Sequence, residues 1–307
     1  MNRPHPGDQV ATLCQHATHS LLLVAPFIKA ASLERLLGSV AATVAVQCVT
    51  RWRPDEIAAG VSDLAVWPLI AARPGATLWL RHDLHAKYYR ADAQVLVGSA
   101  NLTATALGWA SQPNLELLIE VAASDPACAA FEASLWTGAI PADAELHQQM
   151  SVLVAGLPRP PALNPAPEHT SSTPNELACW LPRLRQPADL WLAYDGHSER
   201  LSNASRSAAA ADLVVLAPPP GLTRASFEAT IGALLLQMPL IHALDQQLRT
   251  PQRFGAIRDW LAATPCLYSA DVDPARAWQT VMRWLEHFLP NRYQRLPSRH
   301  SEVLVRR

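Results

Sequence analysis

Lysine is almost absent from this 307-residue chain, since Lys29 and Lys87 are the only two and arginine supplies every other basic side chain. Five cysteines are scattered without any Cys-x-x-Cys spacing, which argues against a zinc site or a disulfide framework and favours a reducing compartment. The apolar stretch Leu21–Phe27 is too short to span a bilayer, and no secretory leader pattern opens the sequence. We therefore expect a cytoplasmic protein without membrane contacts.

The overall charge excludes a uniformly basic chain. The formal net charge is −1, so the chain as a whole lacks the strong positive charge typical of a partner of polyanions. The distribution is uneven, because residues 1–150 carry 13 acidic and 9 basic side chains whereas residues 151–307 carry 13 and 16. Half of the residues are apolar, which is enough for a sizeable core in two domains or in one large one.

Apolar runs alternate with helical patterns through the first 80 residues. The expected elements are strands at Ser20–Phe27, Val44–Thr50 and Ala76–Leu80 and helices at Ala30–Leu37 and Asp55–Ile70. This alternation is typical of an α/β fold with a parallel sheet flanked by helices. Two short strands, Ala86–Arg90 and Gln94–Val97, then favour a hairpin. A helix at Leu102–Ala110 and a buried strand at Leu115–Val121 are expected to follow.

A proline-rich segment separates the two halves of the chain. Six prolines between Leu157 and Pro174 exclude a regular helix or a central strand there. We expect a first domain over residues 1–155, a semi-rigid linker over 156–175 and a mostly α-helical domain over 176–307. The patterns in the last domain favour helices at Phe227–Gln237, Arg253–Ala262 and Ala277–Phe288 and allow strands at Leu190–Tyr194 and Asp212–Ala217.

Polar residues gather in the segment 85–101, HAKYYRADAQVLVGSAN. His85 and Lys87 project from the same face of a strand because side chains alternate, and Ser99 and Asn101 do so at the end of the next strand. If the two strands form a hairpin, all four side chains converge on one patch. A helix beginning at Leu102 would add free N–H groups that favour an anion.

These residue types suit the chemistry of a phosphodiester. A neutral imidazole at His85 can attack phosphorus and form a covalent phosphohistidine. An ammonium group at Lys87 would neutralise the non-bridging oxygens, while Ser99 and Asn101 would donate hydrogen bonds to them. Gly98 would let the backbone approach the substrate closely. Because side chains supply the charge stabilisation, we expect neither a metal ion nor a cofactor.

Two acidic residues complete the expected site. Glu116 stands on the following strand, where a carboxylate could fix the tautomer and orientation of His85, although a polar residue at a strand end is an equal alternative. Asp92 lies between the two short strands and is interpreted as a structural turn residue.

The segment resembles the HxK(x4)D…GSxN signature of the phospholipase D superfamily, and the likeness covers about Leu21–Val121. The resemblance implies a phospholipase D-like mixed or parallel sheet. The spacing from Asp92 to Gly98 is one residue shorter than the commonest pattern, which indicates a shorter hairpin turn.

The resemblance also implies an activity and an assembly. Members of the superfamily pair two such motifs, but the second half of this chain contains no lysine and so no second His-x-Lys. Single-motif members are homodimers with one site between two chains, and the bacterial ones are mostly nucleases. We therefore expect a metal-independent endonuclease that cleaves DNA or RNA, with a role in restriction or phage defence and with a helicase or another defence protein as partner.

Other interpretations remain open. A phospholipase or phosphatidyltransferase would share the motif, and a non-catalytic scaffold would bind phosphate without cleaving it. Arg51 and Trp52 follow the second predicted strand and Lys29 follows the first, where they could hold substrate or form an ordinary solvated loop. Arginines of the C-terminal domain alternate with aromatic residues, which suits DNA binding, dimerisation or partner docking but also a plain amphipathic bundle.

Overall fold

The computed structural model describes residues 5–157, 178–267, 272–296 and 303–307. The chain divides into two compact units, residues 1–165 and 166–307, and each is described by itself. The linker predicted at 156–175 lies outside the described residues except for its first two positions.

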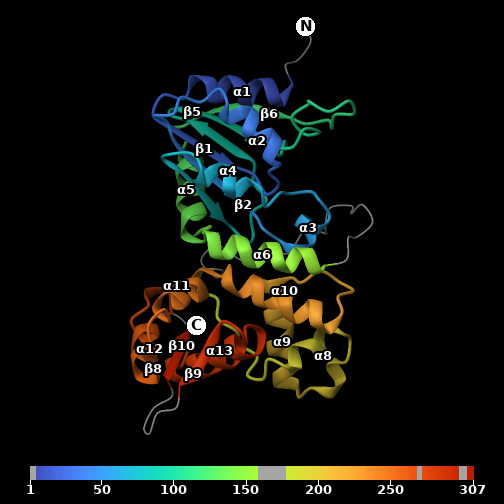
Figure 1. Ribbon diagram of the computed structural model, residues 1–307, viewed down its shortest axis with the longest axis vertical. Coiled ribbons are helices and arrows are strands. Elements are labelled where there is room, and N and C mark those ends of the chain that lie inside the picture. Colours follow the sequence, from blue (N-terminus) through green and yellow to red (C-terminus); the bar gives the residue numbers. More distant parts are fainter. Residues whose placement is uncertain (1–4, 158–177, 268–271, 297–302) are drawn as a thin grey trace. The chain divides into compact units, whose positions relative to one another are not determined.

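The N-terminal unit contains a seven-stranded mixed sheet of order β6-β5-β4-β1-β2-β3-β7 (Figure 1). Its strands are β1 Ser20–Val24, β2 Ala45–Thr50, β3 Ala76–Leu80, β4 Tyr88–Ala91, β5 Gln94–Gly98, β6 Leu118–Ala122 and β7 Ile140–Pro141. The first three are parallel, while β4, β5 and β6 form an antiparallel meander beside β1. The predicted α/β class is confirmed, and the sheet is mixed.

Helices cover both faces of this sheet. They are α1 Pro6–His16, α2 Ala30–Leu37, α3 Pro54–Ala58, α4 Val66–Ala71, α5 Pro126–Thr137 and α6 Ala144–Gly156. On one face, Cys128 and Leu135 of α5 pack with Leu22 and Val24. α1 packs against β4 and α2. Strand β1 is therefore apolar at every buried position, as a central strand between two layers requires.

The turn between β4 and β5 is fastened to the start of β1. Asp92 has a positive φ of 48°, and its carboxylate accepts hydrogen bonds from the backbone N–H groups of Thr18 at 2.8 Å, His19 at 3.1 Å and Ser20 at 2.8 Å. The bond from Thr18 contributes most to lowering the pKa of Asp92, because each donor favours the ionised form. This geometry favours the structural interpretation of Asp92.

Two predicted elements of this unit differ in the structure. Residues 102–110 form turns and no helix, because Leu102 pairs with Ile28 in a β-bridge and Gly108 then takes a positive φ of 78°. The strand expected to be buried at Leu115–Val121 is the edge strand β6, and its approach is open to solvent. Leu115 is fully exposed, Leu117 is 45% exposed and Ile119 is 50% exposed.

The C-terminal unit is mostly helical. Its elements are α8 Asp189–Tyr194, η1 Ser198–Arg200, α9 Asn203–Leu216, α10 Arg224–Leu236, α11 Pro239–Gln247, β8 Gln252–Arg253, α12 Phe254–Ala262, η2 Pro265–Leu267, α13 Pro274–Phe288, β9 Tyr293–Leu296 and β10 Val303–Arg306. The strands predicted at Leu190–Tyr194 and Asp212–Ala217 are wrong. Both segments are helical, since a short apolar run does not by itself distinguish a buried strand from a buried helix.

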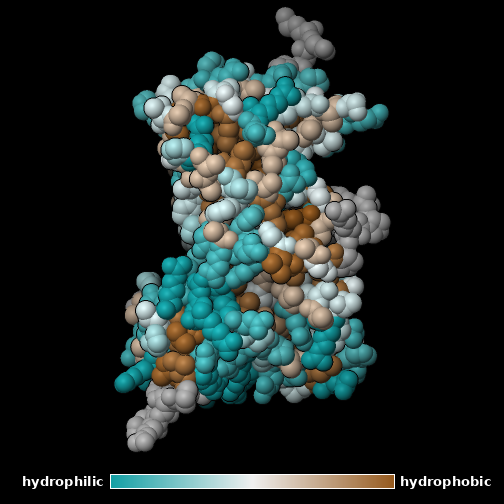
Figure 2. Space-filling view, viewed as in Figure 1, coloured by the Kyte–Doolittle hydropathy of each residue, from teal (hydrophilic) through white to brown (hydrophobic). Residues whose placement is uncertain are grey.

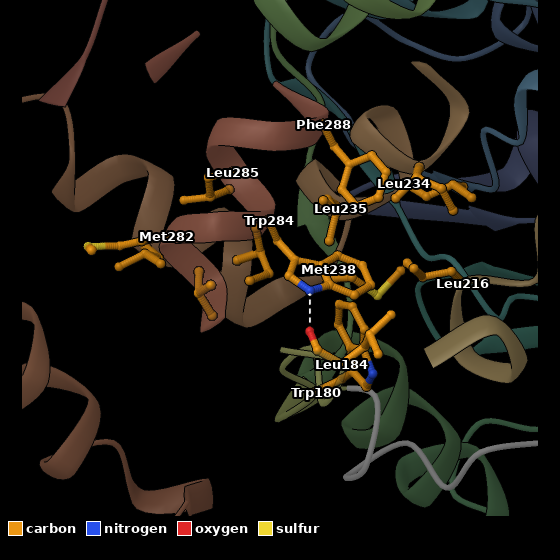
Figure 3. Close-up of a cluster of buried hydrophobic side chains, with 14 of the residues drawn as sticks. Trp180, Leu184, Leu216, Leu234, Leu235, Met238, Met282, Trp284, Leu285 and Phe288 are labelled. Carbon is orange, nitrogen blue, oxygen red and sulfur yellow. Dashed lines mark hydrogen bonds between the residues drawn. The ribbon is translucent and has the colours of Figure 1, made fainter. Parts of the chain in front are cut away.

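Aromatic and aliphatic side chains fill the core of this unit (Figure 3). Trp284 of α13 is fully buried and donates a hydrogen bond from its indole N–H to the carbonyl oxygen of Leu184 at 2.7 Å. Trp180 meets the Trp284 ring edge-on, with ring centroids 6.2 Å apart. The bond satisfies the one polar group of the tryptophan, so that burial of the large ring stabilises the unit.

The predictions for the cysteines and for membrane-spanning segments can be compared with the structure. Cys14, Cys48 and Cys128 are buried free thiols, whereas Cys179 is disulfide-bonded, which the scattered cysteine spacing did not predict. In the ranges that the structure describes, no single helix has the length and apolar character needed to cross a membrane. Helices α10 and α11 reach that threshold only together, and they are bent by 81°.

Candidate active site

The site lies at the edge of the sheet where the parallel strands end. Strand β4 is antiparallel to β1, so the residues before it, His85 to Lys87, lie near the carboxyl end of β1. The backbone N–H of Gly98, at the end of β5, donates to the carbonyl oxygen of Lys87 at 3.3 Å. The two halves of the motif are therefore adjacent, at the sheet edge where α/β folds bind ligands.

The segment after β5 is held closely against the approach to β6. The N–H of Ser99 donates to the carbonyl oxygen of Leu117 at 3.0 Å, and the N–H of Leu117 donates to the Ser99 hydroxyl at 3.1 Å. A Cβ atom on Gly98 would lie 1.9 Å from that same carbonyl oxygen. Only glycine fits at position 98, and its role is close contact within the chain itself.

Glu116 is part of this cluster. Its carboxylate accepts hydrogen bonds from the Ser99 hydroxyl and, at 3.2 Å, from the side-chain amide of Asn114. A carboxylate in this position orients the serine and amide groups directly. Its action on the ring of His85, which is exposed, remains a prediction.

Asn101 and a tyrosine that the sequence reasoning missed fix the rest of the loop. The side-chain oxygen of Asn101 accepts a bond from the backbone N–H of Phe27 at 3.4 Å. The hydroxyl of fully buried Tyr89 donates to the carbonyl oxygen of Ala100 at 2.5 Å. The available signal for Tyr89 was its place two residues after Lys87 in the predicted strand Ala86–Arg90, where alternate side chains share a face.

Lys87 carries the electrostatic character of the site. Its pKa is lowered first by partial burial and then by the positive charge of Arg51, while the negative charge of Glu116 acts in the opposite direction. The Lys87 ammonium donates to the carbonyl oxygen of His85 at 2.8 Å. A desolvated cation beside the histidine backbone is well suited to interact with an anion.

Arg51 is close to the site, but the structure corrects its predicted role as a direct substrate ligand. Its guanidinium is 10% exposed and forms an ion pair with Glu56. It also donates to the carbonyl oxygen of Leu84, the residue before His85, at 3.0 Å. Because it is buried and paired, Arg51 acts through the backbone and the electrostatic potential.

Burial also speaks against the predicted stacking role of Trp52, whereas Lys29 is held in a loop contact. Trp52 is fully buried, with its ring 6.0 Å from that of His147, so it offers no surface for stacking a base. The ammonium of Lys29 bonds to Asp63 at 2.5 Å and to the carbonyl oxygen of Gly60 at 2.9 Å. These bonds fix a neighbouring loop, and a contact between the 34% exposed side chain and a substrate stays a prediction.

A small apolar cavity of about 300 Å³ adjoins the motif, lined by Lys87, Gly98, Tyr88, Phe131 and Val121 among others. Tyr88 and Phe131 stand with ring centroids 4.9 Å apart. Within the described residues, no three His, Cys, Asp or Glu side chains are grouped in a way that could hold a metal ion.

Comparisons with known proteins find likeness in solved structures. No family model and no curated protein matches the chain. NucT from Helicobacter pylori shares 14% identity with a TM-score of 0.33, covering 47% of this chain and 86% of NucT. The phospholipase D family member Nuc from Salmonella typhimurium shares 19% with a TM-score of 0.34, covering 45% and 90%. Phosphatidylserine synthase from Haemophilus influenzae Rd KW20 shares 12% with a TM-score of 0.33, covering 49% of this chain and 34% of the synthase.

Proposed function

We propose that this protein is a phospholipase D-like phosphodiesterase, a nuclease that forms a covalent phosphohistidine at His85. The observation that supports it best is the hydrogen bond between the backbones of Lys87 and Gly98, which joins the two halves of the motif. This pairing gathers a histidine, an ammonium group, a hydroxyl and an amide at one sheet edge. The combination provides a nucleophile and the donors that stabilise a phosphoryl oxyanion.

The proposed reaction has two steps. A ring nitrogen of His85 attacks phosphorus, the bond to the leaving oxygen breaks, and a second histidine gives that oxygen a proton. The same second histidine then takes a proton from water, which attacks phosphorus and releases His85. Lys87 and Asn101 stabilise the charge on the non-bridging oxygens in both steps. The products are an alcohol and a phosphomonoester.

The second histidine is proposed to come from another copy of the chain, because the sequence contains no second His-x-Lys. The approach to β6 supports this, since the exposed side chains of Leu115, Leu117 and Ile119 lie beside Glu116 and on an edge strand. An exposed apolar edge favours pairing with another chain. We propose a two-fold dimer through this edge, with the two copies of His85 at one phosphate.

Nucleic acid is the proposed substrate, and restriction or phage defence with a helicase-like partner is the proposed setting. The single motif supports this choice, since single-motif members of the superfamily are mostly nucleases. Lipid-active members usually carry both motifs in one chain. A non-catalytic scaffold would bind phosphate and would need no proton donor.

The test is cleavage in EDTA. Wild-type protein is incubated with single- and double-stranded DNA, RNA and phosphatidylcholine, beside His85→Ala and the control His16→Ala, whose imidazole is exposed on α1. Cleavage of nucleic acid by the wild type and by the control variant, but not by His85→Ala, supports the proposal. Turnover of lipid alone, or inertness toward all four substrates, would overturn it.

A further inference from the structure

The last part of the C-terminal unit has the arrangement of a winged helix. Helix α11, strand β8, helices α12 and α13 and strands β9 and β10 follow one another along the chain. The three strands form an antiparallel sheet of order β8-β10-β9, so the first strand pairs with the last. Helices α12 and α13 pack against each other, and a helix pair of this kind carries the recognition helix of DNA-binding proteins.

Buried polar contacts join these elements into one body. Asp245 of α11 is almost fully buried and accepts hydrogen bonds from Arg292 at 2.7 Å, Tyr293 at 2.6 Å and Arg306 at 2.8 Å. These donors come from both strands of the β9–β10 hairpin and from the residue before it. The hairpin is therefore fixed to α11, since a buried carboxylate of this kind is stable only with its partners in place.

Helix α13 presents one polar stripe to solvent. Its apolar residues are buried, whereas Arg276, Gln279, Arg283 and Glu286 recur at the spacing of one helical face. Arg276 has 80% of its side chain exposed and lies 3.4 Å from the carboxylate of Asp273, and the guanidinium of Arg283 donates to the carbonyl oxygen of Arg185 at 3.4 Å. Arg295 of β9 pairs with Glu286 at 2.8 and 2.7 Å, which offsets the one acidic residue of the stripe. The stripe is positively charged.

The charge around this stripe favours a polyanion. From Arg249 to the end, the sequence contains ten arginines and five acidic residues, in contrast to the excess of acidic residues in the N-terminal half. Figure 2 shows hydrophilic side chains over the part of the unit where Figure 1 places α13, with a hydrophobic patch beside it toward α12. Arginine is the residue best suited to phosphate contacts because its planar guanidinium donates two parallel bonds.

We propose that the elements from α11 to β10 form a winged-helix module that binds duplex DNA through the exposed stripe of α13. Arg276 and Arg283 are the proposed contacts to the backbone phosphates, and Gln279 lies between them on the same helix face. DNA binding as such does not depend on the proposed nuclease function. The purpose of the binding does rest on it, namely to hold DNA for a catalytic unit that carries more acidic than basic residues. Binding itself is measured without cleavage.

The test uses the full chain carrying His85→Ala and a fluorescent 20-base-pair duplex, followed by anisotropy from 50 to 200 mM salt. Loss of two phosphate contacts in Arg276→Ala/Arg283→Ala should weaken binding by about tenfold to a hundredfold and lower the slope of log K against log[salt] by about 2. The matched control is Arg200→Ala/Arg224→Ala, with the same charge change at exposed positions of the same unit outside residues 239–307.

The outcomes separate this inference from the catalytic proposal. A loss confined to the α13 variant supports the winged-helix site, as does the same loss in the single substitution Arg276→Glu, whose exposed position leaves folding intact. Equal losses in the α13 variant and the control, or no binding of duplex DNA at all, would overturn it. Intact DNA binding beside inert wild-type protein would contradict the nuclease proposal alone.

Discussion

The two units of this protein use similar polar groups in opposite surroundings. In the N-terminal unit, Asp92 accepts backbone hydrogen bonds at the rim of the sheet, and its pKa is lowered by the bond from Thr18 and the donors beside it. In the C-terminal unit, Asp212 accepts bonds from the N–H groups of Arg183 and Leu184, but burial dominates and raises its pKa to about 6. Ionised Asp92 therefore stabilises the folded N-terminal unit, whereas ionised Asp212 destabilises the folded C-terminal unit.

The units differ in the same way at their surfaces. The N-terminal unit has its candidate catalytic groups at one sheet edge, and the charge of Arg51 there is buried and paired. The C-terminal unit has Arg276 on an exposed helix face, where its guanidinium lies 3.4 Å from the carboxylate of Asp273. We infer that catalysis belongs to the N-terminal unit and binding of nucleic acid to the C-terminal unit.

The largest expected effect distinguishes catalysis from DNA binding. Substituting His85→Ala should lower the rate of cleavage by at least about 10³-fold, since a missing nucleophile cannot be replaced by binding. The affinity for DNA should change less than about threefold. Rates come from a cleavage assay and affinities from anisotropy. A variant that lost binding and cleavage together would place grip in the first unit.

The next effect concerns the fold of the site. Gly98→Ala should destabilise the N-terminal unit by about 3 kcal/mol, because the added methyl group would collide with the carbonyl oxygen of Leu117. Gly156→Ala is the matched control, since nothing lies within 4 Å of its added Cβ. Calorimetry of the full chain should show an unfolding transition at a lower temperature than in wild type for Gly98→Ala and no such change for Gly156→Ala. Equal stability of the two variants would contradict the packing described here.

A paired substitution tests the aspartates, beginning with Asp92→Asn. The lowered pKa means that the carboxylate stabilises the folded state above the unfolded value of about 3.9, and that this stabilisation is lost as the pH falls below it. The variant should be about 2 kcal/mol less stable than wild type at pH 7. The difference should shrink below pH 4, as followed by urea unfolding. A constant difference across this range would exclude the charge as its cause.

The opposite pH dependence is expected for Asp212→Asn. Because the folded pKa is raised to about 6, ionisation costs stability progressively from about pH 4 to pH 6, and the full cost is present above that range. The amide has no such cost, so the variant should gain about 2 kcal/mol relative to wild type between pH 4 and pH 7. A parallel course of the two unfolding curves would show that burial does not raise this pKa.

The sequence was most informative where a pattern was long or chemically specific. The helix Ala30–Leu37 and the strand Ala76–Leu80 have the predicted bounds, because apolar periodicity and clear breaks define them. The meeting of His85-x-Lys87 with Gly98-Ser99-x-Asn101 followed from the hairpin alone. Whether these side chains carry the proposed roles is for the experiments above.

Tertiary contacts decided what the pattern could not. Trp52 has polar neighbours in the sequence but is fully buried. One of its contacts in the fold is His147 of α6, almost a hundred residues later in the sequence. The helix expected from Leu102 gave way to a bridge with Ile28. The winged-helix order also depends on β8, a strand of two residues, which is too short for any periodic signal.

The most direct test of the central claim is to trap the covalent intermediate. Wild-type protein is mixed with a labelled oligonucleotide in EDTA, quenched in base within the first turnover, digested and analysed by mass spectrometry. We predict a phosphonucleotide adduct on the peptide that contains His85, stable in base and labile in acid, and absent from His85→Ala. Cleavage without an adduct, or an adduct on another residue, would contradict the account.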